Sequence, residues 1–172
     1  SSYGIECSKE SKPFIGSCQY DASGEILKHL YGNLKEPMPP ESKNFFDLDQ
    51  SQFMEKGQPS SISMAKKAFL YVPKACQSKK KCKLHVAFHG CSQTTKDIGD
   101  QFYKKAGYNR WAENNNIIIL YPQAISRITM MNPNGCWDWY GYTNSLMGAH
   151  LSHTKQAPQI KALKKMIDSL VD

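Results

Sequence analysis

The sequence has no long hydrophobic run, and this absence narrows the kinds of protein it can encode. Its longest purely aliphatic stretch extends from Ile117 to Leu120, whereas a membrane-spanning helix needs roughly 18 apolar residues. A mean hydropathy of −0.56 agrees with this. The 172 residues suffice for one domain with a real core, but not comfortably for two. We therefore expect a single domain, residues 1–172, without a membrane span.

A signal peptide and zinc-type cysteine spacings are also missing. The chain begins Ser1-Ser2 without a methionine or an apolar leader, which we interpret as a mature product, a processed fragment or an expressed segment. No cysteine pair has the short spacing of a zinc site. The six cysteines fall instead into local groups, namely Cys7 with Cys18, Cys76 with Cys82, and the remaining Cys91 with Cys136. Although six cysteines allow many connectivities, we expect three disulfides and a secreted protein, extracellular or periplasmic.

Neither the charge nor the histidines indicate a nucleic-acid or metal site. The net charge is +7, but the lysines are scattered and form no basic stripe with aromatics, so a solvated surface is favoured over nucleic-acid binding. His85 and His89 lie roughly 13 Å apart on a strand, too far for one metal ion. His150 and His153 have no acidic or cysteine neighbour. We expect no metal and no cofactor.

Four short segments predict β-strands, at residues 45–49, 68–72, 84–89 and 117–121, and the third of them alternates with period two. The last run is unbroken and β-branched, which is typical of a strand buried on both faces. Residues 97–115 predict a helix weakened at Gly99 and Gly107. Strand, helix and strand then form a right-handed parallel crossover. The loop between Cys76 and Cys82 is short enough to join neighbouring strands.

Two amphipathic helices complete the prediction. The first begins after Asp21 and stops at Gly32, with Ile26, Leu27 and Leu30 facing inward. The last has Pro158 in its first turn and an inward face made of Ile160, Leu163, Ile167, Leu170 and Val171. The domain then divides into residues 1–34, a disulfide loop and short helix; 35–64, a proline-rich linker with the first strand; and 65–172, the α/β core.

The candidate chemistry follows the third predicted strand. In α/β enzymes, functional loops lie beyond the carboxyl ends of parallel strands, where this chain has His89-Gly90-Cys91. Gly90 lets the backbone turn sharply and present a bare N–H, the kind of donor that stabilises an oxyanion. The same tripeptide is also an ordinary strand-ending turn. A disulfide from Cys91 to Cys136 would tie the following aromatic segment over it.

Four segments in order carry a specific resemblance: residues 84–93 (LHVAFHGCSQ), 107–112 (GYNRWA), 115–123 (NNIIILYPQ) and 132–139 (NPNGCWDW). Together they resemble extracellular polyhydroxybutyrate (PHB) depolymerases, in the circularly permuted type of catalytic domain. The resemblance implies part of an α/β-hydrolase fold. This part would supply its first four strands, in a mixed sheet of order 1-2-4-3 with flanking helices and disulfides.

The resemblance also implies what is missing. In that family an N-terminal portion carries the nucleophilic serine in a Gly-x-Ser-x-Gly turn, then the aspartate and the histidine. No Gly-x-Ser-x-Gly occurs here, and the chain looks as if it begins after that histidine. The Cys91 backbone N–H matches an oxyanion-hole donor, and Trp137 and Trp139 resemble residues that line the substrate crevice. We expect His89, Gly90 and Tyr140 to bind substrate beside them. Packing explains Tyr140 and Tyr142 equally well, and Asp138 is expected to be a structural acceptor. Ser92 is expected to cap the following helix.

Two hypotheses remain. The first is the C-terminal part of a secreted, depolymerase-like serine esterase acting on polyester or short-chain ester, inactive alone. Its partner would be the upstream half, in the same or a separate chain, pairing with the free side of the third strand; otherwise that edge would self-associate. The second is a non-catalytic secreted binding protein or effector that retains the fold and the aromatic crevice.

Overall fold

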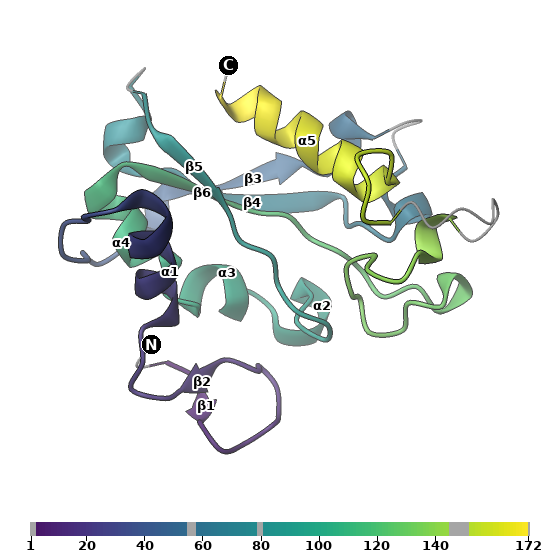
Figure 1. The fold of residues 1–172 in the computed structure, drawn as a ribbon, viewed down its shortest axis with the longest axis horizontal. Coiled ribbons are helices and arrows are strands. Elements are labelled where there is room, and N and C mark those ends of the chain that lie inside the picture. The colour runs from purple at the N-terminus through teal and green to yellow at the C-terminus, as the bar shows by residue number, and fades with distance from the viewer. Residues whose placement is uncertain (1–2, 55–57, 79–80, 145–151, 172) are drawn as a thin grey trace.

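The computed structural model describes residues 3–54, 58–78, 81–144 and 152–171. It has three layers (Figure 1): a central mixed sheet lies between α5 (Pro158–Val171) on one face and α1 (Ala22–Tyr31), α3 (Gln101–Lys105) and α4 (Tyr108–Asn115) on the other. A small N-terminal lobe projects beyond these layers. None of the described helices is long and apolar enough to cross a membrane.

The sheet contains β3 (Phe45–Asp49), β4 (Lys67–Tyr71), β5 (Lys83–Val86) and β6 (Ile117–Tyr121), in the order β3-β4-β6-β5. β3 and β6 run antiparallel to β4, and β5 runs parallel to β6. Because β6 lies between β4 and β5, the loop closed by Cys76 and Cys82 joins strands that are not neighbours, so that expectation is wrong. The predicted strand 84–89 ends at Val86, although the Ala87 N–H still bonds Leu120 O at 2.9 Å.

β6 is buried on both faces, as its sequence predicts. Ile117, Ile119 and Tyr121 are completely buried in the core formed with α1 and α4. Leu120 is equally buried on the opposite face, where it joins the core that holds Met166 of α5. The sheet therefore has a hydrophobic core on each side. Packing on both faces fixes the orientation of the strands, and with it the place where each strand ends.

Helix α1 has the predicted ends, because Asp21 accepts from the Gly24 N–H and the chain turns at Gly32 with φ 81°. Its predicted inward face is partly wrong. Leu27 is fully buried, but Ile26 and Leu30 are 42% and 58% exposed. The cause is α4: a Cβ at Gly24 would lie 2.6 Å from the Trp111 ring, so α1 approaches α4 on its glycine face.

The crossover helix is broken as predicted, into α2 (Thr95–Ile98), α3 and α4, with positive φ at Gly99 and Gly107. Helix α5 contains Pro158 in its first turn, but its most buried apolar residues are Ala162, Leu163 and Met166. Val171, predicted to face inward, is 57% exposed. Short 3-10 helices connect the larger elements: η1 (Ser42–Asn44), η2 (Gln50–Phe53), η4 (Pro59–Ile62), η5 (Lys74–Cys76), η6 (Ile128–Met130) and η7 (Tyr142–Asn144).

The N-terminal lobe is a small structure in which β1 (Ile5–Glu6) pairs with β2 (Gly16–Ser17) in parallel. The three disulfides join the expected partners: Cys7 with Cys18, Cys76 with Cys82, and Cys91 with Cys136. The first disulfide closes the lobe. The third links two segments that are 45 positions apart, and both of these segments build the candidate site.

Candidate functional site

A tight turn follows β5 at the carboxyl end of the sheet. The Gln93 N–H donates to Gly90 O at 3.2 Å, and the Gln93 side-chain Oε1 accepts the Gly90 N–H at 2.7 Å. Ser92, the third residue of the turn, has φ 58°, a conformation that costs a non-glycine residue about 1 kcal/mol or more. The sequence predicted that Ser92 caps the helix that follows. This prediction is wrong, because the N-cap residue of α2 is Thr94. We call this turn together with His89, residues 89–93, the oxyanion turn, after the role predicted from its sequence.

Between Gly90 and Gln93, the oxyanion turn leaves the Cys91 backbone donor without a partner among the described hydrogen bonds. The Gly90 N–H is held by Gln93, and the Ser92 N–H donates to Asn134 O at 2.7 Å. Among the hydrogen bonds of the described residues, none uses the N–H of Cys91, which is an exposed residue. An N–H fixed between two bonded neighbours is preorganised to donate to a ligand oxygen.

His89 supports this turn from inside the protein. Its side chain is only 2% exposed, and its Nε2 accepts the Ala124 N–H at 3.0 Å. Nδ1 must then carry the ring proton, and it donates to Gly90 O at 2.8 Å. Burial lowers the pKa of His89, which favours this neutral form. With both nitrogens engaged, the ring positions the turn, and the contact of His89 with substrate stays a prediction.

The segment that carries the second cysteine is locked onto the turn. Asn132 is completely buried; its Oδ1 accepts the Cys136 N–H at 2.8 Å, and its Nδ2 donates to Cys136 O at 3.0 Å. Gly135 has φ 60°, and a Cβ there would lie 2.4 Å from the Thr94 side chain. The disulfide between Cys91 and Cys136 completes a rigid connection between the two segments.

The aromatic residues of this segment divide into packed and exposed ones. Trp137 is half-buried, packs edge-to-face on Phe88 with ring centres 5.1 Å apart, and donates from Nε1 to His89 O at 3.1 Å. Tyr142 is buried and donates to Cys136 O at 2.7 Å. Trp139 is 73% exposed. Trp137 therefore supports the turn, while Trp139 is free to contact a ligand.

Asp138 is a structural acceptor, as expected. Its Oδ1 accepts the N–H groups of Gly141 and Tyr142 at 2.6 and 2.8 Å, and its Oδ2 accepts the Thr143 N–H at 3.1 Å. Both carboxylate oxygens are thus engaged as acceptors within the loop. They shape the loop from which Trp139 projects.

Exposed apolar side chains adjoin the turn and form what we call the aromatic surface: Ile128, Met131, Trp139 and Tyr140, exposed by 80%, 65%, 73% and 39%. Trp139 and Tyr140 pack edge-to-face at 5.0 Å, and the Tyr140 hydroxyl donates to Met131 O at 2.5 Å. Ile128 and Met131 were not expected, because nothing in the sequence placed residues 128–131 beside the tryptophan. Clusters of exposed apolar side chains often mark ligand or partner sites.

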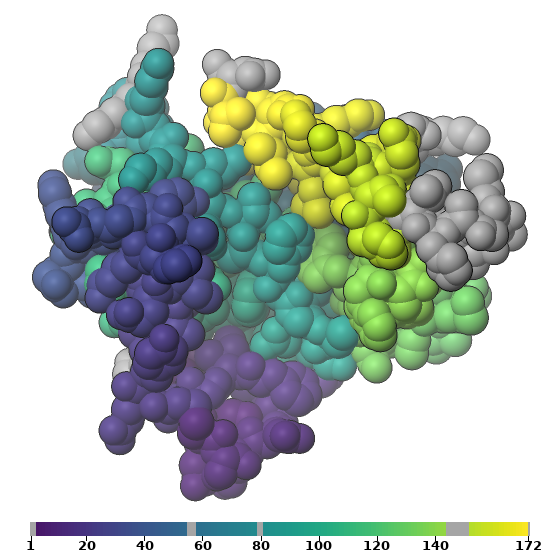
Figure 2. All heavy atoms as spheres, viewed as in Figure 1, coloured from purple at the N-terminus to yellow at the C-terminus, as the bar shows by residue number. Residues whose placement is uncertain are grey.

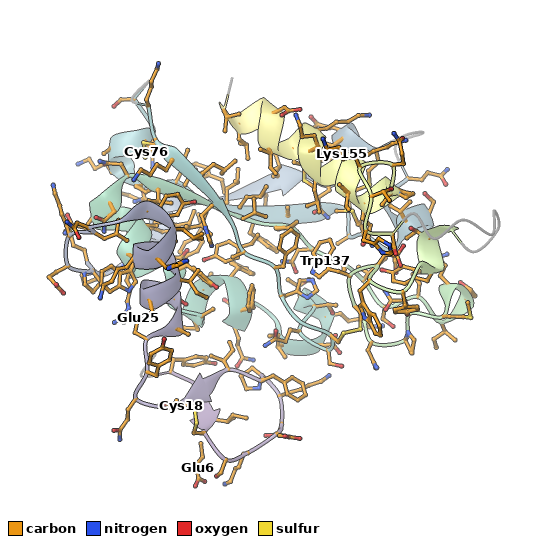
Figure 3. All side chains as sticks on the ribbon, in the orientation of Figure 1. Glu6, Cys18, Glu25, Cys76, Trp137 and Lys155 are labelled. Carbon is orange, nitrogen blue, oxygen red and sulfur yellow. A yellow bond between two sulfur atoms is a disulfide. The ribbon has the colours of Figure 1, made fainter. Side chains whose placement is uncertain are left out.

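Figure 2 shows the segment after β5, in teal, between the purple N-terminal lobe and the green segment that carries the aromatic surface. In Figure 3, Trp137 and Cys18 are labelled on opposite sides of the connection from β5 to α2. Within the described part of the chain, no group of three His, Cys, Asp or Glu side chains is placed to hold a metal ion. His150, which has no acidic or cysteine neighbour in the sequence, lies outside the described residues.

Comparison with known proteins identifies relatives of this chain. No family model matches the chain. Two curated relatives are a poly(3-hydroxybutyrate) depolymerase of Delftia acidovorans, 40% identical over 96% of the chain, and a polyhydroxybutyrate depolymerase of Talaromyces funiculosus, 42% identical over 81%. The chain spans only 32% and 43% of the lengths of these relatives.

Solved structures give the same result. A PHB depolymerase from Penicillium funiculosum superposes with a TM-score of 0.84 at 35% identity, covering 98% of this chain and 53% of that one. A serine-to-alanine PHB depolymerase complexed with an R3HB trimer superposes with a TM-score of 0.81 at 34% identity, with the same coverage. The chain thus has the fold of about half of these enzymes.

Proposed function

Because this chain is homologous to one part of the polyhydroxybutyrate depolymerases, we propose that it is the C-terminal, oxyanion-hole-bearing part of a secreted, depolymerase-like serine esterase. The observation that carries the proposal is the exposed Cys91, whose N–H no described hydrogen bond uses, between the bonded Gly90 and Ser92 N–H groups. The three disulfides support a secreted location, because such bonds persist in oxidising compartments.

The Cys91 N–H would act during acyl transfer. When a serine attacks the ester carbonyl, negative charge develops on the carbonyl oxygen, and a fixed backbone donor stabilises it without reorganising. One such donor contributes about 3 kcal/mol, on the order of a hundredfold in kcat. The disulfide, His89 and Gln93 keep this donor in place. The nucleophile and its base would come from the part of the enzyme that this chain does not contain.

The aromatic surface would contact the substrate. One structural relative is complexed with an R3HB trimer, and we extend this ligand class to the present chain as oligomers or short-chain esters of hydroxyacids. Exposed Trp139 and Tyr140 offer apolar faces to the carbon chain of such an ester. Glycine at position 90 lets Gln93 hold the turn closely, because a Cβ there would lie 2.9 Å from Gln93 Oε1.

The missing half would dock on the free edge of the sheet. β5 pairs only with β6 among the described strands, so its other edge presents unpaired backbone groups. Phe88, just beyond β5, is 47% exposed. The flanking helix α1, whose Tyr31 hydroxyl bonds Leu84 O at 2.9 Å, carries the exposed Ile26 and Leu30. A complementary segment, in the same or a separate chain, would cover this apolar edge; alone, the chain would self-associate through it.

The test is to assay p-nitrophenyl butyrate hydrolysis by the chain alone, by the complementary segment of a relative alone, and by their mixture. Activity is expected only in the mixture. Activity of the chain alone would contradict the absence of a nucleophile. Binding of PHB films without hydrolysis in any sample would instead favour the second candidate, a secreted binding protein that uses the aromatic surface.

A further inference from the structure

Gln93 links two parts of the molecule that the sequence keeps far apart. Its Oε1 accepts the Gly90 N–H at 2.7 Å, within the oxyanion turn. Its Nε2 donates to Pro13 O at 2.8 Å and to Phe14 O at 3.1 Å, both in the N-terminal lobe. The residue is only 9% exposed. One buried amide therefore uses its acceptor on the turn and its donors on the lobe.

The other polar connections of the lobe lie nearer the surface. Lys12 pairs with Asp97 at 2.8 Å, with the lysine side chain 52% exposed, and exposed ion pairs contribute little to stability. The Tyr3 hydroxyl donates to Gln101 Oε1 at 2.5 Å, where neither residue is fully buried. Neither of these contacts touches residues 89–92. Only Gln93 reaches from the lobe to the turn in the described hydrogen bonds.

The position of Gln93 determines which donor the turn leaves open. By accepting the Gly90 N–H, its Oε1 commits the donor that precedes Cys91. The next peptide, which carries the Cys91 N–H, is held at its carbonyl, Gly90 O, by the Gln93 backbone N–H and the His89 ring. The approach is close, since a Cβ at Gly90 would lie 2.9 Å from Oε1. Ser92, on the other side of Cys91, holds the strained φ of 58°, which persists only when surrounding contacts maintain it.

We propose that Gln93 is a positioning residue that couples the N-terminal lobe to the orientation of the Cys91 N–H. It does not touch the substrate. Loosening the lobe would change the geometry of the turn, and loosening the turn would free the lobe, because coupling between two sites is reciprocal. The catalytic consequence rests on the proposed function, whereas the structural coupling does not.

The bond of Gln93 to the turn can be separated from its bonds to the lobe by substitution, because the amide oxygen makes the first and the amide nitrogen makes the others. In Gln93→Glu, an ionised carboxylate still accepts the Gly90 N–H but faces two carbonyl oxygens, those of Pro13 and Phe14, with no donor. Burial and this environment raise the pKa of the new carboxyl. Once protonated, it donates to one carbonyl and restores part of the link. Gln93→Glu should therefore behave like the wild type at acid pH and like Gln93→Ala at alkaline pH.

The control is Asn115, a second side-chain amide that joins two segments. Its Oδ1 accepts the Lys35 N–H at 2.7 Å, and its Nδ2 donates to Lys35 O at 3.0 Å and to Trp111 O at 2.8 Å. It precedes β6, at the opposite end of the sheet from the turn. Asn115→Ala therefore removes an equivalent set of three hydrogen bonds without touching residues 89–93.

The experiment measures amide hydrogen exchange at Ser92, whose N–H bonds Asn134 and not Gln93. Gln93→Ala should accelerate this exchange about tenfold, as loss of a buried hydrogen bond predicts, and Asn115→Ala should leave it unchanged. Cys7→Ser/Cys18→Ser, which opens the lobe, should accelerate it as well. Gln93→Glu should do so only at alkaline pH, which keeps the test informative if Gln93→Ala does not fold. Equal Ser92 exchange in wild type and Gln93→Glu at alkaline pH would overturn the coupling.

In the mixture of complementary segments, Gln93→Glu at alkaline pH should lower kcat about tenfold relative to the wild type at that pH, as misplacement of an oxyanion donor predicts. KM should not change, since Gln93 does not touch substrate. A mixture without activity would contradict the proposed function alone, because the exchange measurement stands without it. Coupled exchange with an unchanged kcat would show that the lobe does not act on catalysis, and would overturn the catalytic half of the inference.

Discussion

The oxyanion turn and the aromatic surface are neighbours, but they are held in different ways. In the turn, buried His89 and Gln93, a disulfide and Asn134 fix the backbone around the Cys91 N–H. In the aromatic surface, the Trp139 side chain is largely exposed, and among the described residues its ring packs on that of Tyr140 alone. The difference teaches that the group proposed to act in the chemistry is rigid, while the groups proposed to contact a polymer lie open to solvent.

The largest expected effect is on the rigid side of this comparison. Cys91→Ser/Cys136→Ser should lower the free energy of unfolding by about 4 kcal/mol. The reason is that a disulfide removes more conformational entropy from the unfolded chain when it closes a longer loop. The matched control is Cys76→Ser/Cys82→Ser, whose cysteines are 6 positions apart rather than 45, for which we expect about 2 kcal/mol. Urea denaturation measures both. Equal losses would show that the disulfide at the turn gives no more than a local constraint.

Two tryptophans in one loop test the difference directly. Trp137→Ala removes the packing on Phe88 and the bond to His89 O, and should cost about 3 kcal/mol. Trp139→Ala should change stability by less than about 0.5 kcal/mol and weaken adsorption to PHB films. Thermal unfolding and a film-binding assay distinguish the two. If Trp139→Ala destabilises the fold as much as Trp137→Ala, the aromatic surface is a packed element and not a contact surface.

Protonation of His89 should loosen the turn. Burial lowers its pKa in the folded state, so the unfolded chain binds a proton at a pH where the folded chain does not. The free energy of unfolding should therefore fall as pH drops below the ordinary histidine range and level off below the folded-state pKa. His89→Gln should flatten this dependence, while His153→Gln, at an exposed position, should not. His85, also buried with a lowered pKa, should account for the dependence that remains. An unchanged slope in His89→Gln would contradict the neutral, buried ring.

The smallest expected effect concerns strain. Ser92→Gly should raise stability by about 0.5 kcal/mol, since glycine adopts positive φ freely but loses more entropy on folding. Met131 also has a positive φ, 56°, but it lies in the aromatic surface and is 65% exposed. Met131→Gly therefore measures the release of the same backbone strain at a position outside the turn. Differential scanning calorimetry measures both. A loss of stability in Ser92→Gly alone would show that the hydroxyl of Ser92, and not the backbone, maintains the turn.

Much of the fold follows from local patterns. The strands at residues 45–49 and 117–121 and the glycine breaks of the crossover were predicted, because alternation, β-branched runs and glycine act over a few residues. The inward face of α1 was not, because contact with Trp111, far along the chain, selects the side of the helix that carries Gly24. The end of β5 at Val86 was not predicted either, because it depends on where the backbone leaves the sheet to form the turn.

The candidate site was only partly predictable for the same reason. Its centre at Cys91 and its aromatic loop follow from sequence motifs. The role of Gln93 does not, because its donors bind carbonyls 79 and 80 positions away. The supporting role of His89 depends likewise on a distant partner, because its ring accepts the Ala124 N–H, 35 positions away. A pattern that shows residue types cannot show which distant backbone groups they reach.

The most direct test of the central account is the amide resonance of Cys91 in the mixture of complementary segments, on addition of a phosphonate that reacts with the nucleophilic serine. We predict a large downfield shift of the Cys91 N–H, because the phosphonyl oxygen accepts its hydrogen bond, with little change at Ser92, whose N–H already bonds Asn134 O. A Cys91 resonance that stays in place while the serine is modified would contradict the account.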